Sequence, residues 1–137
     1  MILPDKWIRK AVFNAVNGIT VNGEVIPCYD LQATNYDGDN YVIMSTQTAS
    51  QKDSKCGNGW DATILLDCVN RSRKNAGSRL MADDIAQGVI DALDGLQLSG
   101  TAIRISSMRL NAPNDLVTEL PSEIITRKLL RYELTIN

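Results

Sequence analysis

The chain has 137 residues, of which 44% are apolar and 22% are charged, and its formal net charge at pH 7 is −2. This length and apolar content suit one folded domain, residues 1–137, and argue against a disordered chain. The slight acidic excess argues against a dedicated nucleic-acid-binding protein, which usually carries a basic excess. No apolar run approaches the roughly 20 residues of a membrane helix, and the start of the chain lacks signal-peptide features. We therefore expect a cytoplasmic protein with no membrane partner.

The first part of the chain predicts a helix followed by a small hairpin. From Asp5 to Asn17, apolar residues recur at helical spacing, and Asn17-Gly18 suits the end of the helix. Asn22-Gly23 lies between β-branched residues, which is typical of a tight β-hairpin because both residues tolerate positive φ. The polar segment from Tyr29 to Asn40 predicts a loop.

Two strands separated by a long loop are expected in the middle of the chain. Tyr41 to Gln47 is a predicted strand with a continuous apolar start. Trp60 to Val69 is a second predicted strand, since apolar residues occupy every second position. The polar segment from Thr48 to Gly59 predicts a long hairpin loop between them. Long loops in compact domains often carry function; the alternative is a mobile loop without a role.

A basic turn and a second helix come next. The segment from Asn70 to Gly77 has no apolar period, and a helical stripe then runs to Leu96. Ser78 is a candidate N-cap of this helix, and Gly95 is a candidate C-terminal stop.

The last part of the chain predicts two strands that pair antiparallel. They are Ala102 to Leu110 and Ile124 to Ile136, and the proline-containing segment from Asn111 to Glu123 predicts a second long connection between them. The elements together predict an α+β fold of two layers. A mainly antiparallel sheet of about four strands carries two helices on one face, with a small additional hairpin.

The sequence offers little catalytic chemistry. Histidine is absent, and no residues have the spacing of an acid–base pair, a zinc site or a CxxC motif. We therefore expect no enzymatic activity, no metal and no cofactor. The cysteines, Cys28, Cys56 and Cys68, are odd in number and lack a secretory signal, which favours free thiols. Cys68 shares the apolar face of its strand, so we expect it to be buried.

Arg71, Arg73 and Lys74 form the one basic cluster of the sequence. Such a run is usually a solvated turn. The alternative is contact with an acidic partner or with the phosphates of passing DNA.

The elements follow one another in a distinctive order, and each carries a local pattern. A short amphipathic helix precedes a strand, a lysine- and glycine-containing hairpin, a second strand, a basic turn and a second helix. The patterns are Asn17-Gly18, Pro27-Cys28-Tyr29-Asp30, Tyr41-Val42-Ile43-Met44, Trp60-Asp61-Ala62-Thr63-Ile64-Leu65-Leu66-Asp67-Cys68-Val69, Arg71-Ser72-Arg73-Lys74, Ala82 to Leu93 and Leu96-Gln97-Leu98-Ser99-Gly100.

In this order and these patterns, over nearly its whole length, the chain resembles the tail-completion, or tail-terminator, proteins of long-tailed bacteriophages. The resemblance implies a subunit that forms a ring, commonly a hexamer, at the head-proximal end of the tail tube. Such a ring ends tube polymerisation and joins the tail tube protein to the head connector or stopper protein, and DNA only passes through its lumen. The implied location is the tail or neck of a virion, with the host cytoplasm during assembly. The Asn22-Gly23 hairpin and the Asn111 to Glu123 connection depart from the family pattern.

Two sets of residues are candidates for contacts in such a ring. The hairpin around the loop from Thr48 to Gly59 resembles the one that reaches the tube or the lumen in that family. With the basic cluster, it supplies the candidate partner or lumen contacts Lys52, Asp53, Lys55, Arg71, Arg73 and Lys74. Apolar residues on nominally solvated strand faces are candidates for burial between subunits. These candidate subunit-interface residues are Leu65, Val69 and Leu129.

Three other functions fit the sequence. A head–tail connector or stopper protein of the neck would belong to the same virion. A small enzyme would need a cleft with a perturbed titratable group. A small nucleic-acid-binding module would show salt-sensitive binding to DNA through the basic cluster.

Overall fold

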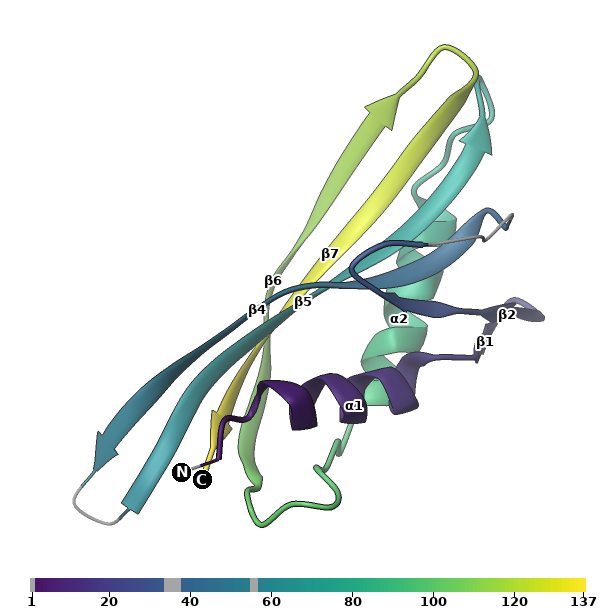
Figure 1. Ribbon diagram of the computed structural model, residues 1–137. Coiled ribbons are helices and arrows are strands. Elements are labelled where there is room, and N and C mark those ends of the chain that lie inside the picture. Colours follow the sequence, from purple (N-terminus) through teal and green to yellow (C-terminus); the bar gives the residue numbers. More distant parts are fainter. Residues whose placement is uncertain (1, 34–37, 55–56) are drawn as a thin grey trace.

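Apolar residues at helical spacing form both helices that the sequence predicts. The computed structural model describes residues 2–33, 38–54 and 57–137, and it describes no side chains at 53–54 and 57–58. Figure 1 shows the elements in their spatial arrangement. In chain order they are α1 (Asp5–Val16), β1 (Ile19–Val21), β2 (Glu24–Ile26), β3 (Cys28–Asp30), β4 (Asn40–Ser54), β5 (Gly57–Arg73), α2 (Leu80–Leu93), β6 (Ile105–Glu119) and β7 (Glu123–Ile136).

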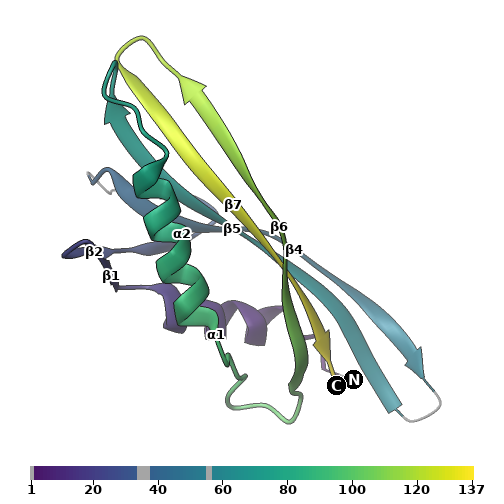
Figure 2. The ribbon, with the colours of Figure 1, turned by 180° about the vertical axis from the view of Figure 1, so that it is seen from behind.

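Both helices pack on the same face of the main sheet, and opposite views place them on the same side (Figures 1 and 2). α1 contributes Ile8 and Val12 to the apolar core, and α2 contributes Ile85 and Val89. Alternate residues of β5 and β7 meet them from the sheet. Each fully buried aliphatic side chain of this kind stabilises the fold by about 1.5–3 kcal/mol. The predicted α+β fold, with two helices on one sheet face, is confirmed.

The ends of α2 follow the local signals in the sequence. The hydroxyl of Ser78 accepts a hydrogen bond from the Leu80 N–H at 3.2 Å, although the helix itself begins only at Leu80. Gly95 has φ +71° just beyond the helix, and a left-handed residue at this position is a common way to end a helix.

The main sheet has five strands in the order β3-β4-β5-β7-β6, and β1 and β2 form a separate two-stranded hairpin. All neighbours in the main sheet are antiparallel except β3 and β4, which are parallel. The prediction of about four strands was one short, because Tyr29 lies in β3 and not in a loop. Only three residues long, β3 shows no periodicity in the sequence, and its place is set by pairing with β4, where Cys28 lies opposite Val42.

The predicted long loop from Thr48 to Gly59 is wrong. β4 continues to Ser54 and β5 begins at Gly57, with Thr48 opposite Thr63 and Lys52 opposite Gly59. Most of this ribbon extends beyond the helices (Figure 1), and Ala49 is its one described apolar side chain that packs against the core, so the segment needs few apolar residues. Apolar alternation, the usual strand signal, is therefore missing from a segment that is nevertheless paired.

The predicted second long connection is also mostly strand. β6 runs to Glu119 and pairs with β7 along most of its length, with a break in register between Asn111 and Asn114. Pro113 lies within this break, and β6 is an edge strand of the sheet. An edge position with a bulge tolerates the missing N–H of proline. The basic turn is shorter than predicted as well, because β5 extends to Arg73.

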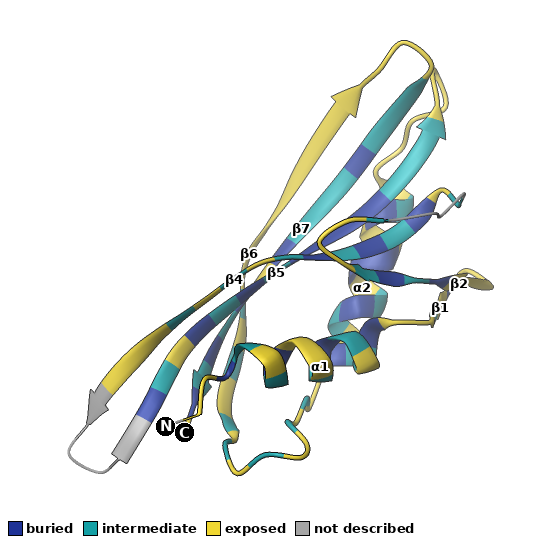
Figure 3. Cartoon of the chain, viewed as in Figure 1, coloured by how far each residue is buried: buried dark blue, intermediate teal, exposed yellow. Residues whose placement is uncertain are grey.

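The strand extensions form two arms that project from the body in opposite directions (Figures 1 and 2). The β4–β5 arm comprises residues 50–54 and 57–61, beyond Ala62 and Ile64 of the core. The β6–β7 arm comprises residues 111–129, and the C-terminal end of β5 runs beside it. Figure 3 shows burial concentrated where the strands cross the helices, whereas β6 is exposed along its arm.

Candidate functional site

The sheet face opposite α1 and α2, called here the helix-free face, carries a band of charged residues. Ile64 and Leu66 of β5 belong to the core, so the alternate residues Leu65, Asp67 and Val69 point to the other face. Their neighbours across β7 include Arg131 and Arg127. This face is therefore where the polar positions of the central strands gather.

Asp67 and Arg127 form the most buried ion pair of this face among the described residues. The Asp67 side chain is 4% exposed and that of Arg127 is 36% exposed. Arg127 Nε donates to Asp67 Oδ2 at 2.8 Å, and Nη2 donates to the same oxygen. These hydrogen bonds raise the pKa of Arg127. The pair fixes the register of β5 and β7 at the centre of the face.

Arg71 pairs with Glu123 at the base of the β6–β7 tip. Its Nε and Nη2 donate to both carboxylate oxygens of Glu123 at 2.9–3.1 Å, and these hydrogen bonds raise the pKa of Arg71. A two-pronged arginine–carboxylate pair restricts the geometry of both strands. Arg71 is therefore engaged within the subunit, whereas the sequence suggested a residue of a solvated turn.

The other two residues of the basic cluster lie beside the tip of the β6–β7 arm and are exposed. Arg73 is opposite Glu123 in the strand register. The backbone N–H of Lys74 donates to the carbonyl of Ser122 at 3.4 Å. The structure thus divides the predicted cluster, since one arginine stabilises the arm while Arg73 and Lys74 border its tip.

Two of the three candidate residues of the predicted long loop, Lys52 and Asp53, lie in the β4–β5 arm. Lys52 is exposed and forms an ion pair with Asp61 at 3.5 Å. Asp53 is in β4, with its backbone opposite Asn58, and its side chain is not described. Lys55 lies outside the described residues. An exposed pair such as Lys52–Asp61 contributes little to stability.

Two of the three candidate interface residues lie together on the helix-free face. Leu65 and Leu129 are half-buried, and with Asn111 and Arg131 they line a small pocket of about 160 Å³. Val69 is 2% exposed and lies between Tyr41 and Arg127 in the strand registers. Val69 therefore offers no surface to a neighbour, which corrects that part of the prediction.

The β6–β7 arm carries an apolar surface that the sequence analysis missed. Leu116 is 44% exposed, Val117 48% and Leu120 39%. The hairpin closes where the Leu120 N–H donates to the Glu123 carbonyl at 2.8 Å. Leu116 and Val117 are consecutive residues of β6 and point to opposite faces of the arm, so the arm offers apolar contacts on both faces near its tip. The available signal was their apolar character within a segment that was expected to be a polar connection.

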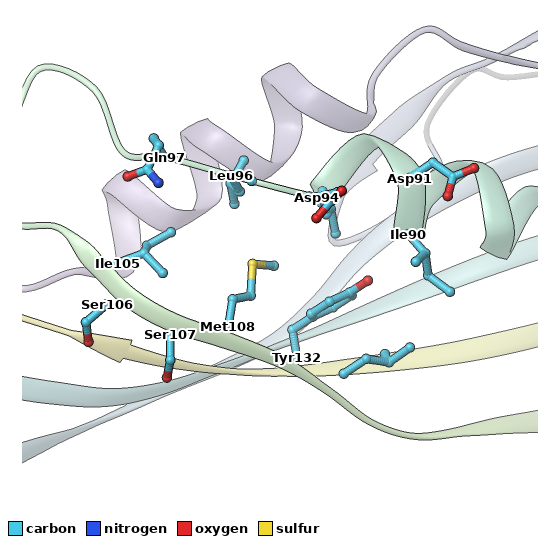
Figure 4. Close-up of a pocket in the computed structure, with 13 residues that line it drawn as sticks. Ile90, Asp91, Asp94, Leu96, Gln97, Ile105, Ser106, Ser107, Met108 and Tyr132 are labelled. Carbon is cyan, nitrogen blue, oxygen red and sulfur yellow. The ribbon is translucent and has the colours of Figure 1, made fainter.

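A groove of about 460 Å³ lies between the C-terminal end of α2 and the first half of β6. Its sheet side includes Ile105, Met108 and Tyr132, and its helix side includes Asp91 and Asp94 (Figure 4). Burial raises the pKa of Tyr132 to about 12. The groove thus combines an apolar floor with an acidic rim, and none of its residues was singled out for a role by the sequence.

The cysteine expectations are tested in part. Cys28 and Cys68 are free and buried, which confirms the expectation for Cys68, and Cys56 lies outside the described residues. Burial raises the pKa of the Cys28 thiol to about 12 and raises the pKa of Cys68 as well. Such thiols are poor nucleophiles.

Within the described ranges, no three His, Cys, Asp or Glu side chains gather as a metal site. Among the helices described, none has the length and apolar character needed to cross a membrane.

No protein-family model matches the sequence, and no curated protein matches it significantly. The fold is similar to that of a chain in the solved structure described as "Virion of native gene transfer agent (GTA) particle". The TM-score is 0.71 at 16% sequence identity, and the match covers 98% of this chain and 99% of that chain. The two chains therefore share a fold over their whole length.

Proposed function

We propose that this chain is a structural subunit of a phage-like virion that forms a ring at the head-proximal end of a tail tube. There it ends tube polymerisation and provides the joint to the head connector. One observation carries the proposal: the whole fold, arms included, matches a chain of a gene transfer agent virion. The resemblance of the sequence to tail-terminator proteins supports the position within the tail. A non-enzymatic role is part of the proposal.

The shape of the subunit fits a ring. A ring of identical subunits uses heterologous contacts, in which two unlike surfaces of neighbouring copies meet. The subunit offers unlike surfaces, since the exposed side chains of the β4–β5 arm are polar whereas the β6–β7 arm exposes Leu116, Val117 and Leu120. The pairs Asp67–Arg127 and Arg71–Glu123 join β5 to β7 beside the β6–β7 arm and so hold that arm to the body.

The experiment is co-production of this protein with the tail tube protein of the same virus, followed by electron microscopy. We expect one closed ring at one end of each tube, and longer tubes when the protein is left out. Tubes of the same length with and without the protein, and without a terminal ring, would contradict the proposal. A ring found on the head side, separated from the tube by another protein, would instead assign the chain as a connector or stopper.

A further inference from the structure

We propose that the tip of the β6–β7 arm of one copy docks in the groove between α2 and β6 of a second copy. The inference rests on the proposed ring and deepens it, because it names the two unlike surfaces that meet.

The tip presents apolar side chains beside positive charge. Leu120 and Val117 are exposed, and the exposed residues Arg73 and Lys74 border the same tip. The tip is also held in place. The Leu120 N–H bonds to the Glu123 carbonyl, and Glu123 is bound by both prongs of Arg71. A pre-organised tip loses little conformational freedom when it binds.

The groove has the complementary chemistry. Its volume of about 460 Å³ suffices for a leucine and part of the adjacent turn. Met108 and Tyr132 reach into it from the sheet, while Asp91 and Asp94 lie on the helix side (Figure 4). An apolar side chain such as Leu120 can enter the floor while a lysine approaches the carboxylates. Charge complementarity of this kind gives an interface its orientation.

A subunit cannot fill its own groove with its own tip. The groove is lined by β6 from Ile105 to Leu110, and the tip begins at Leu120 of the same chain. Ten residues of strand separate Leu110 from Leu120, a span of about 30 Å. The strand pairs with β7 over this length and cannot fold back. The occupant that fits is therefore the tip of a second copy. Because tip and groove differ, the contact can repeat from copy to copy, and it gives a ring when the rotation between neighbours closes.

Charge reversal tests the polar half of the contact. We expect Lys74→Glu and Asp94→Lys each to weaken self-association at least about tenfold, and the double variant Lys74→Glu/Asp94→Lys to recover most of the loss. Both side chains are exposed, so circular dichroism spectra should remain unchanged. Additive losses in the double variant would contradict a direct approach of Lys74 to Asp94.

Disulfide trapping tests the apolar half and decides the proposal. In a Cys56→Ser background, one population carries Leu120→Cys and the other carries Gln97→Cys, an exposed position that lines the groove (Figure 4). The native cysteines Cys28 and Cys68 are buried and react slowly. After mild oxidation of the mixture, we expect disulfide-linked dimers at least about tenfold above those in either population alone, because docking raises the effective concentration of the two thiols.

In the control, Val25→Cys takes the place of Leu120→Cys. Val25 is 63% exposed and lies on the separate β1–β2 hairpin. The control should give no excess of dimer with Gln97→Cys. Electron microscopy of the same samples separates the docking contact from the ring itself. Rings without the disulfide between positions 120 and 97 would overturn the docking inference alone. Absence of both rings and disulfide, with tube protein present, would overturn the proposed ring as well.

Discussion

Arg127 of β7 directs two N–H groups at a single oxygen, Oδ2, of Asp67 on the neighbouring strand β5. The other carboxylate oxygen, Oδ1, is buried and has no hydrogen-bond partner among the described residues. Arg127 thus balances the negative charge of Asp67, whose side chain is only 4% exposed. Removal of one partner from such a pair leaves a charge without compensation.

Arg127→Met should lower the free energy of unfolding by about 2 kcal/mol. The expected loss lies below the roughly 3–5 kcal/mol typical of fully buried pairs, because Arg127 is about one-third exposed. Urea denaturation provides the measurement. Asp67→Leu/Arg127→Met should regain most of the loss, since no buried charge remains. The matched control is Arg109→Met, whose pair with Glu133 is far more exposed; equal losses at Arg109 and Arg127 would refute the explanation.

Stability should decrease in alkali through Cys28. Burial, with a smaller contribution from the charge of Asp30, raises the pKa of its thiol from 9.0 to about 12. Below pH 9 the thiol is protonated in the folded and the unfolded chain alike, so it does not change the free energy of unfolding. As the pH rises from 9 towards 12, the unfolded chain loses this proton first, so folding loses up to about 1.4 kcal/mol per pH unit.

The measurement compares unfolding free energies at pH 7 and pH 10.5. Cys28→Ala should be less stable at pH 7, because it leaves a small cavity, yet it should lose less stability on going to pH 10.5. An identical alkaline loss in both proteins would show that Cys28 is not responsible.

Two glycines should respond differently to alanine. A Cβ at Gly59 would lie 2.7 Å from the Ile136 carbonyl oxygen, so Gly59→Ala must push β5 and β7 apart. A Cβ at Gly88, in α2, would lie 3.0 Å from a side-chain methyl of Val21, which can move. The helix also gains up to about 1 kcal/mol from alanine. We expect Gly59→Ala to lower the thermal midpoint by several degrees and Gly88→Ala to leave it nearly unchanged; the reverse order would contradict the packing described.

The β4–β5 arm should be dispensable for folding and needed for assembly. Gln51 and Trp60 are opposite each other in the register, so residues 52–59 can be replaced by Asn-Gly, which suits a two-residue hairpin turn. The exposed Lys52–Asp61 pair is lost, and the unfolding free energy should change by about 1 kcal/mol or less. Electron microscopy should then show tubes without terminal rings. Rings of normal appearance on tubes of normal length would remove any role for the arm.

Periodicity predicted the elements that bury one face. The stripes of α1 and α2 and the alternation from Trp60 to Val69 were sufficient because the residues that make these patterns, such as Val12, Val89 and Ile64, enter one core. Apolar periodicity did not predict the parts of the strands that form the two arms. Ser50 to Lys52 and Asn111 to Glu119 lie in strands but are exposed, so their side chains show no pattern of burial. β3 was missed because pairing with β4, a long-range contact, determines it.

The candidate site was only partly predictable for a similar reason. Arg71, Arg73 and Lys74 are conspicuous in the sequence, but the partner Glu123 is far along the chain and is brought beside Arg71 by β7. The groove arises only when α2 lies across β6, so its acidic rim and apolar floor come from separate segments. Leu65 and Leu129 were identifiable from strand parity, whereas the burial of Val69 depends on its neighbours across the sheet.

The most direct test of the account is cryo-electron microscopy of this protein assembled on tail tubes of its own virus. The account predicts a single closed ring at the head-proximal end, with the Leu120 tip of each subunit seated between α2 and β6 of the next. A single copy per tube, an open spiral, or tubes that end without this protein would contradict it.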